Sequence, residues 1–163
     1  MKIERGGSAD LPAVVELLDG AVAWLVDIGA TGQWGTTGWS ASPRRLAALE
    51  EKLRTDTLWL AIGDQEAGGP PIGAMTLSRQ PIAYIDPVDE PEVYVTLLVT
   101  SRHHRGAGIG SALLDHARTR TRELGAGLLR VDCYRGEDGR LVDYYRRNGF
   151  APARPFHVGD WPG

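Results

Sequence analysis

The sequence predicts a mixed α/β (α+β) fold, in which a mostly antiparallel sheet carries helices on both of its faces. Three observations support this fold class. Apolar residues recur at helical spacing in four segments, short β-branched or aromatic runs lie between them, and turn residues mark the boundaries. With 163 residues, of which 42% are hydrophobic, the chain has the length of one domain, residues 1–163, and can bury a substantial core.

The first third of the chain predicts a strand and two helices. A short strand is expected at 2–5. Ser8 or Asp10 can cap the helix that follows. The apolar residues of this helix share one face: Leu11, Val14, Val15, Leu18, Val22 and Leu25. After an irregular, glycine-rich segment, Ser42 and Pro43 provide the cap and the first residue of a second helix.

The remaining segments predict further strands and two more helices. Strands are expected at 57–63, 71–78, 92–100 and 127–134. The first two suit a hairpin, with the turn-rich residues 63–73 as its loop. A helix follows "HHRGAGIGSALL" (103–114), with Ile109, Leu113, Ala117 and Leu124 on one apolar face. A short helix then ends at Asn148 and Gly149, and a proline-rich tail can add short strands.

Charge and composition exclude several kinds of partner. The formal net charge of −3 gives no overall positive field for nucleic acid. The single cysteine, Cys133, excludes an internal disulfide and a cysteine-based metal cage, and no histidine–carboxylate cluster predicts a metal site. No apolar run is long enough to span a membrane, and the first residues lack the apolar region of a signal peptide. We therefore expect a cytoplasmic protein without metal, nucleic acid or membrane partners.

The glycine stretch within residues 103–114 allows several interpretations. A Walker phosphate loop is excluded, because Gly110 is followed by Ser111 and not by lysine. Gly106, Gly108 and Ser111 have the spacing of a dinucleotide fingerprint, with Asp132 downstream. However, a polar run separates the glycines from the preceding strand, and too little chain follows to complete a doubly wound sheet. A plain strand-to-helix connection also remains open, although three glycines in five residues would destabilise a helix start.

An anion site agrees better with this stretch. Amides of a first helical turn lack intrahelical partners, and the helix dipole adds partial positive charge. The segment from Arg105 to Gly110 also resembles the R/Q-x-x-G-x-G/A motif of the GNAT N-acetyltransferase superfamily. The resemblance extends from about residue 2 to about residue 161. Residues 23–34 and the segment from Val131 to Phe150 are further similar to bacterial members of this superfamily, which supports the fold and is silent on the acceptor.

The resemblance implies acetyl-CoA as co-substrate. It implies that the loop holds the coenzyme A pyrophosphate through Arg105, Gly106, Ala107, Gly108, Ile109, Gly110 and Ser111. The preceding strand would pair its backbone with the pantetheine arm at Leu98, Val99 and Thr100. The sheet would be splayed between this strand and 127–134 to admit the thioester. Without the resemblance, both segments are simply core strands.

The segment "YYRRNGF" (144–150) resembles the superfamily pattern L-Y-x-x-x-G-F. The matching tyrosine is Tyr145, which the resemblance makes the acid that protonates the departing coenzyme thiolate. Tyr145 could instead only pack on the coenzyme. Seven residues earlier, where the superfamily often has asparagine, stands Asp138. It is a candidate coenzyme contact, or it caps the short helix.

The base is predicted less well than the acid. An alkylammonium must lose a proton before it attacks a thioester, directly or through a water. Glu92 is the first candidate and Asp132 the second, although each fits a solvated carboxylate at a strand end better than a base. His103 and His104 fit a surface turn near the phosphates better than catalysis. Cys133 fits a buried small residue better than a nucleophile.

The sequence thus predicts an N-acetyltransferase that transfers acetyl from acetyl-CoA to a primary amine by direct attack. The acceptor is a small molecule or a peptide amine, and monomer and homodimer are both compatible with the sequence. Trp34 and Trp39 lie in the segment expected to form the acceptor wall, where they either contact the acceptor or anchor the loop. A non-catalytic acyl-CoA-binding sensor remains the alternative from another class of function.

Overall fold

A five-stranded sheet forms the centre of the protein in its computed structural model, which describes residues 1–64, 69–136 and 138–163. The strands are β1 (Lys2–Arg5), β2 (Thr57–Ile62), β3 (Pro71–Ser78), β4 (Glu92–Thr100) and β5 (Leu128–Val131), in the spatial order β1-β2-β3-β4-β5. The first four pair antiparallel, and β5 joins β4 in parallel. This mostly antiparallel sheet confirms the predicted fold class.

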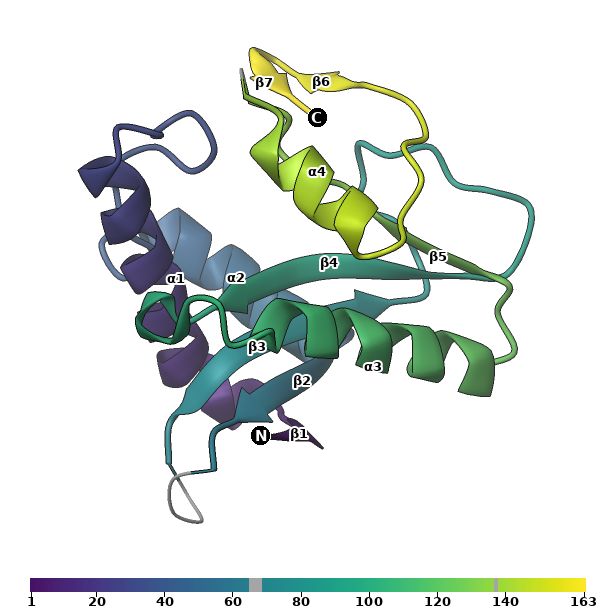
Figure 1. Cartoon of the computed structure of the whole chain (residues 1–163), viewed down its shortest axis with the longest axis horizontal. Coiled ribbons are helices and arrows are strands. Elements are labelled where there is room, and N and C mark those ends of the chain that lie inside the picture. Colours follow the sequence, from purple (N-terminus) through teal and green to yellow (C-terminus); the bar gives the residue numbers. More distant parts are fainter. Residues whose placement is uncertain (65–68, 137) are drawn as a thin grey trace.

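Helices cover both faces of the sheet (Figure 1). On one face lie α1 (Leu11–Asp27) and α2 (Pro43–Thr55), and on the other lie α3 (Ile109–Glu123) and α4 (Arg140–Arg147). Two 3-10 turns, η1 (Ser8–Asp10) and η2 (Arg102–His104), precede α1 and α3. The tail forms a separate two-stranded sheet of β6 (His157–Val158) and β7 (Trp161–Pro162), as its composition suggests.

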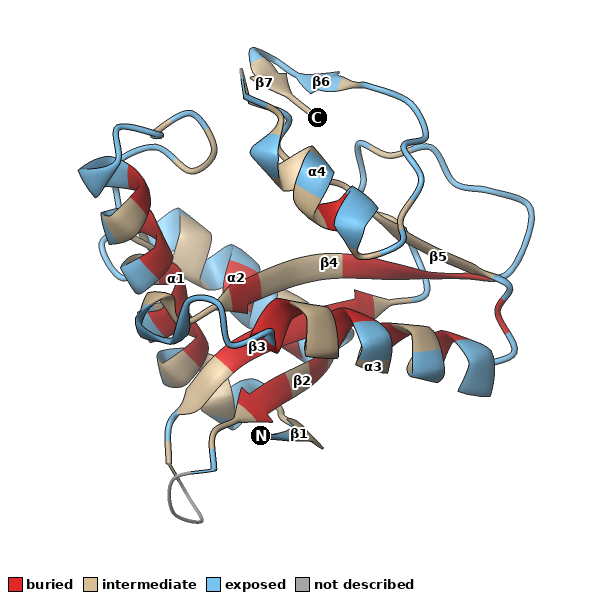
Figure 2. Cartoon of the chain, in the orientation of Figure 1, coloured by how far each residue is buried: buried red, intermediate tan, exposed pale blue. Residues whose placement is uncertain are grey.

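Each face of the sheet has its own hydrophobic core (Figure 2). On the α1 and α2 face, Val14 and Leu18 are fully buried against β2 and β3. On the α3 and α4 face, Leu113 and Leu114 of α3 pack with Met75 of β3. A helix that buries one stripe on a sheet is stabilised mainly by this packing, so the apolar periodicities located α1 and α3 correctly.

Helix boundaries agree with the capping residues, with two corrections. The hydroxyl of Ser42 accepts a hydrogen bond from the Arg45 amide, as a cap should. Asp10 stands at the cap position of α1, but its carboxylate accepts from the Gly7 amide and does not cap the helix. Leu124, predicted on the buried face of α3, lies just beyond the helix end and is exposed. Part of the predicted hairpin loop 63–73 lies outside the described residues.

A β-bulge divides β4 into two halves. Thr76 of β3 pairs with Leu97, whereas the next residue, Leu77, pairs with Val95, so Thr96 is the extra residue. Val95 faces the α3 core, whereas Thr96 and Leu97 both turn to the α1 and α2 face. The bulge therefore brings two consecutive side chains to one face. Beyond it, the alternation of side chains between the two faces of the sheet is shifted by one residue.

The parallel pair of β4 and β5 is short. It runs from Glu92 opposite Leu128 to Val95 opposite Val131 and ends where the bulge begins. A strand was predicted to continue to residue 134, but β5 ends at Val131. Because β4 bends at the bulge, the residues after Val131 no longer have a ladder partner. The two strands thus separate at one defined level of the sheet.

Candidate active site

The glycine loop presents free amides at the start of α3. Gly108 precedes the helix in a left-handed conformation with φ of 71°, and Gly106 has φ of 83°. Within the described chain, the amides of 108–111 have no backbone acceptor, and the first helical bond runs from the Ala112 amide to the Gly108 carbonyl. A Cβ added at Gly106 or Gly108 would meet no atom within 4 Å. The loop is therefore an open surface of N–H donors at a helix N-terminus, which suits an anion.

Gly110 is required for a different reason. A Cβ at this position would collide with the hydroxyl of Tyr144, and Thr100 of β4 lies close by. Thus the Tyr144 side chain of α4 reaches the first turn of α3. Burial raises the pKa of Tyr144, and a hydrogen bond to Ser111 opposes this increase. The loop, the end of β4 and α4 form one continuous site.

The basic residues beside the loop differ in their surroundings. Arg105, His103 and His104 are exposed, and the Nδ1 of His104 lies 3.1 Å from the Ser101 hydroxyl. This agrees with a surface turn before the loop. Arg102, which sequence reasoning did not single out, stacks on Trp24 with its guanidinium carbon 3.5 Å from the ring centroid. Burial lowers the pKa of Arg102, and the charge of Arg105 lowers it further.

The edge of β4 that faces β5 is free beyond the bulge. Leu98, Val99 and Thr100 pair with β3 on their other edge, at Met75, Ala74 and Gly73. Among the described residues, no strand pairs with 96–100 on the β5 side. An extended chain could add here as a short strand, since its amides and carbonyls would meet unpaired backbone groups.

Tyr145 points into the core beside this free edge. It is buried on the α3 side and packs edge-on against Tyr144 and Phe150, with ring centroids 5.4 and 5.7 Å away. Burial raises the pKa of Tyr145 strongly, and the nearby Cys133 thiol adds to this increase. The phenol therefore keeps its proton at neutral pH and is a hydrogen-bond donor.

Glu92 is held in an ion pair. Its two carboxylate oxygens accept hydrogen bonds from the Nε and Nη2 of Arg130, at 2.6 and 2.8 Å, and its side chain is only 5% exposed. A carboxylate that is buried and already paired with a guanidinium is poorly accessible to an incoming ammonium. The geometry therefore argues against Glu92 as the base and gives it a role in joining β4 to β5.

Asp132 lies where the two strands separate, directly after the last paired residue of β5. Its carboxylate accepts hydrogen bonds from the hydroxyls of Tyr84 and Tyr94, each at 3.0 Å. Burial raises the pKa of both tyrosines, and the Asp132 charge raises it further. Each carboxylate oxygen retains a lone pair, so Asp132 can still accept a proton from a third group.

Cys133 follows Asp132 and is half-buried. Burial raises the pKa of its thiol to about 11, and the charge of Asp132 adds to this effect. The thiolate is the nucleophilic form of cysteine, so the residue is a poor nucleophile at neutral pH.

On the opposite face of the sheet, a cavity of about 330 Å³ opens beside the bulge. Its walls are mostly aromatic and aliphatic and include Trp34, Trp39, Ile82, Tyr84, Thr96 and Leu97. The two tryptophans meet edge to face, with centroids 5.1 Å apart, and both also pack on the core beneath α1. The sequence left two roles open for them, acceptor wall or loop anchor. In the structure both tryptophans pack on the core and both line the cavity.

Comparison with known proteins decides the family. A sequence model described as the acetyltransferase (GNAT) family matches residues 21–150. The chain belongs to the GNAT acetyltransferase family. No curated protein sequence shows a significant match.

Solved structures agree with this GNAT fold. A mutant of the BH1408 protein from Bacillus halodurans has a TM-score of 0.72 at 13% identity, with 97% of this chain and 98% of that chain covered. A transcriptional regulator from Bacillus halodurans C-125 has a TM-score of 0.68 at 18% identity, covering 98% and 99%. An apo aminoglycoside 6′-N-acetyltransferase from Acinetobacter haemolyticus has a TM-score of 0.65 at 15% identity, covering 98% and 97%. At these identities the likeness concerns the fold.

The GNAT family generally uses acetyl-CoA, and the residues named for it lie together. The free β4 edge, the open glycine loop and Tyr145 are brought side by side by α3, α4 and the end of β4. Asp138 lies apart on the surface, where its carboxylate accepts from the Arg140 amide at the start of α4 and pairs with the Arg140 side chain. The structure thus gives Asp138 a contact with the first amide of α4, although Gly139 and not Asp138 stands at the N-cap position.

Sequence reasoning missed the residues around the bulge of this GNAT domain. Thr96 lies inside a predicted strand, and the sequence analysis singled out neither Lys52 nor Asp56. The three meet beside the cavity. The only signal in the sequence is that Thr96 interrupts the run 93–99, whose other residues are apolar or aromatic, and this does not locate a bulge. Within the described residues, no cluster of histidine, cysteine or carboxylate side chains could hold a metal ion, and no helix is long and apolar enough to cross a membrane.

Proposed function

We propose that the chain is an N-acetyltransferase that transfers the acetyl group of acetyl-CoA to a primary amine by direct attack on the thioester. One observation carries this proposal. Where β4 and β5 separate, the sheet has a candidate site on each face. The face covered by α3 and α4 carries the open amides of the glycine loop, and the face covered by α1 and α2 carries the aromatic cavity. A donor and an acceptor could therefore meet from opposite faces of the sheet.

On the donor side, the amides of residues 108–111 would bind the pyrophosphate, with Arg105 adding charge at the rim. The free edge at Leu98, Val99 and Thr100 would pair with the pantetheine arm as an added strand. The other loop residues that would surround the pyrophosphate are Gly106, Ala107, Ile109 and Gly110. Each of these contacts uses a group that is unpaired or exposed in the structure.

Acid and base come from opposite sides of the separated strands. Tyr145 would protonate the departing thiolate, because its buried phenol holds a proton at neutral pH. Asp132 would take the proton of the amine, directly or through a water, since it is only half-buried and its partners are neutral phenols, whereas Glu92 is buried and paired with the charge of Arg130. The neutral Cys133 thiol supports direct transfer over an acetyl-cysteine step.

The experiment is to follow free thiol release when the protein is mixed with acetyl-CoA and a panel of primary amines. We expect release that depends on both the protein and a particular amine, with one acetylated amine formed per thiol. A non-catalytic acyl-CoA sensor would bind acetyl-CoA tightly and release no thiol with any amine. That result would contradict the enzymatic proposal.

A further inference from the structure

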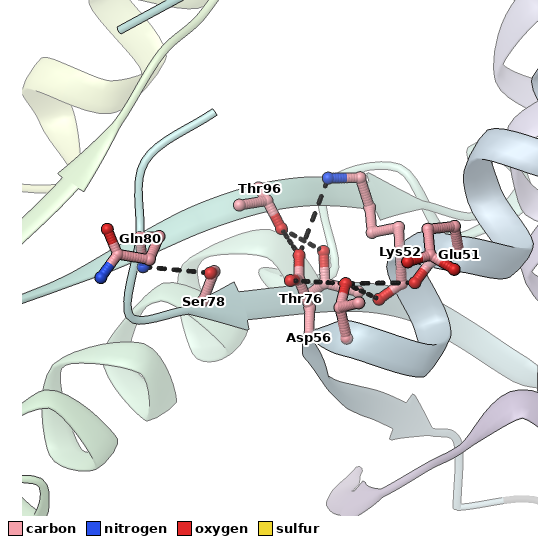
Figure 3. A network of polar contacts seen from close by, with 8 residues as sticks. Glu51, Lys52, Asp56, Thr76, Ser78, Gln80 and Thr96 are labelled. Carbon is pink, nitrogen blue, oxygen red and sulfur yellow. Dashed lines mark hydrogen bonds and ion pairs between the residues drawn. The ribbon is translucent and has the colours of Figure 1, made fainter. Parts of the chain in front are cut away.

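A polar network lies at the point where α2 ends and β4 bulges (Figure 3), and two of its residues, Lys52 and Thr96, also line the cavity. Lys52 and Asp56 come from the C-terminal end of α2, Thr76 from β3 and Thr96 from the bulge. The Thr96 hydroxyl donates to Oδ2 of Asp56 and lies 2.7 Å from the Thr76 hydroxyl. Asp56 is 10% exposed and Thr76 is fully buried. Such a network fixes the orientation of each group in it.

The direction of these hydrogen bonds determines what Thr96 offers to the cavity. An ionised carboxylate only accepts, so the single proton of Thr96 goes to Asp56. Thr76 must then donate its own proton to the oxygen of Thr96. Thr96 is one of the residues that line the cavity, and its oxygen therefore has one free lone pair and no proton to give. The Thr96 hydroxyl oxygen can therefore accept a hydrogen bond from the N–H of an amine.

Lys52 lines the same cavity, and its ammonium has N–H donors that are free to bind a further group. Its ammonium lies 3.7 Å from Oδ2 of Asp56, beyond hydrogen-bond distance, and its side chain is 28% exposed. An ammonium has three N–H donors, so a second anion can bind beside Asp56. Because Thr96 and Lys52 approach the same oxygen of Asp56, their acceptor and donor groups lie close together.

The other charge on the cavity wall is also positive. Arg45 stacks over Trp39 at 4.7 Å and donates to the carbonyls of Trp34 and Thr37. One cation already occupies the Trp39 ring, so this ring is poorly suited to bind another. Among the described residues that line the cavity, Lys52 and Arg45 carry charge and none is a carboxylate, while Asp56 contacts Lys52 and Thr96 from outside this lining. A substrate with many ammonium groups would be repelled there.

We propose that the acceptor is an amino acid, in which a carboxylate lies next to the amine and the side chain is apolar or aromatic. The amine would donate to Thr96, the carboxylate would accept from Lys52, and the side chain would pack on Trp34, Ile82 and Leu97. The short separation of Thr96 and Lys52 suits an amine and a carboxylate on the same or adjacent carbon atoms. This inference rests on the proposed N-acetyltransferase function and names its substrate class.

The test compares amino acids with the same amines lacking the carboxylate. The pairs are phenylalanine with 2-phenylethylamine, methionine with 3-(methylthio)propylamine, and leucine with isoamylamine, and the polycations spermidine and kanamycin complete the panel. For at least one pair, kcat/KM from thiol release should be tenfold or more in favour of the amino acid, and both polycations should be the poorest substrates.

Lys52→Met should raise KM for the preferred amino acid and reduce the tenfold ratio within its pair to threefold or less. Lys52→Arg, which keeps a cation at this position, should restore the ratio in part. Arg54→Gln is the matched control, because Arg54 is an exposed cation on the same helix that pairs with Glu51. It should leave kcat/KM unchanged for both members of the pair. A ratio that is unaffected by Lys52→Met would overturn the assignment of Lys52.

The two proposals fail in distinguishable ways. If spermidine, kanamycin or the decarboxylated amines are acetylated as well as the amino acids, the enzyme is an N-acetyltransferase and the amino-acid inference is wrong. If acetyl-CoA binds but no amine in the panel releases thiol, both proposals are contradicted.

Discussion

The Tyr94 hydroxyl of β4 donates a hydrogen bond at 3.0 Å to Asp132, the residue that directly follows the last paired residue of β5. Tyr84 approaches the same carboxylate from the segment between β3 and β4. This contact places a charged oxygen acceptor at the level where the strands separate, on the face that carries the aromatic cavity. The location is the reason that we assign Asp132 as the base in place of Glu92.

Asp132→Asn should lower kcat by about a hundredfold, since removal of a general base typically costs 10²–10⁴ in rate. Steady-state thiol release on a confirmed amine measures the effect. The folded state should be little affected, because the asparagine oxygen still accepts from one tyrosine.

Glu92→Gln is the comparison variant for Asp132→Asn. It leaves the charge of Arg130 partly buried without its counter-ion, so we expect a loss of stability of about 2 kcal/mol, or roughly 6 °C in Tm. Its kcat should change less than threefold. A larger fall in kcat for Glu92→Gln than for Asp132→Asn would return the base to Glu92.

Tyr145→Phe should lower kcat by about a hundredfold while the Kd for acetyl-CoA stays within threefold. Phenylalanine keeps the packing against Tyr144 and Phe150 and removes only the hydroxyl. Calorimetry and thiol release separate the two effects. Tyr144→Phe is the neighbouring control, because the Tyr144 hydroxyl lies against Gly110 in the loop, so its loss should affect Kd more than kcat. Equal turnover of Tyr145→Phe and the unchanged protein would end the assignment of Tyr145 as acid.

Gly108→Glu should weaken acetyl-CoA binding by at least about a hundredfold, because a carboxylate would stand against the pyrophosphate at the helix N-terminus. Gly108 has a left-handed backbone, so any side chain there also costs about 1–2 kcal/mol of stability. Gly108→Ala carries the same backbone cost without the charge. Calorimetry should therefore show a much smaller loss of affinity for alanine. Equal losses for both variants would mean that loop geometry, and not charge, controls binding.

The Cys133 thiol should react slowly with iodoacetamide at neutral pH. Its raised pKa of about 11 means that the thiolate is scarce below this pH and increases about tenfold per pH unit. At pH 8 we expect alkylation about a hundredfold slower than that of free cysteine, measured by mass spectrometry of the intact protein. Cys133→Ala should retain acetyl transfer. Rapid alkylation at pH 7, or loss of transfer in Cys133→Ala, would instead indicate a nucleophilic thiol.

Most of the fold could be predicted from the sequence because its signals are local. The periodicity of α1, the Ser42 cap and the apolar run of β4 each depend on neighbouring residues. The bulge at Thr96 could not be predicted, since it is a property of pairing with β3. The early end of β5 follows from that bulge, so the predicted strand to residue 134 was too long.

The candidate site divides in the same way. The glycine loop and the segment around Tyr145 are short motifs that the sequence displays directly. The ion pair of Glu92 with Arg130 joins residues that are 38 positions apart, and the contact of Thr96 with Asp56 joins residues that are 40 apart. Such contacts depend on how the strands align in the sheet, and one sequence alone does not reveal which distant side chains that alignment brings together. For this reason the sequence locates the candidate donor residues, whereas the ion pair of Glu92 and the lining of the cavity emerge only from the structure.

The most direct test of the account is transfer of an isotopically labelled acetyl group from acetyl-CoA, followed by mass spectrometry of both the amines and the protein. The account predicts a labelled N-acetyl amine, one per thiol released, and no labelled protein during turnover. Tight binding of acetyl-CoA without a labelled amine, or a label that accumulates on Cys133, would contradict direct transfer at this site.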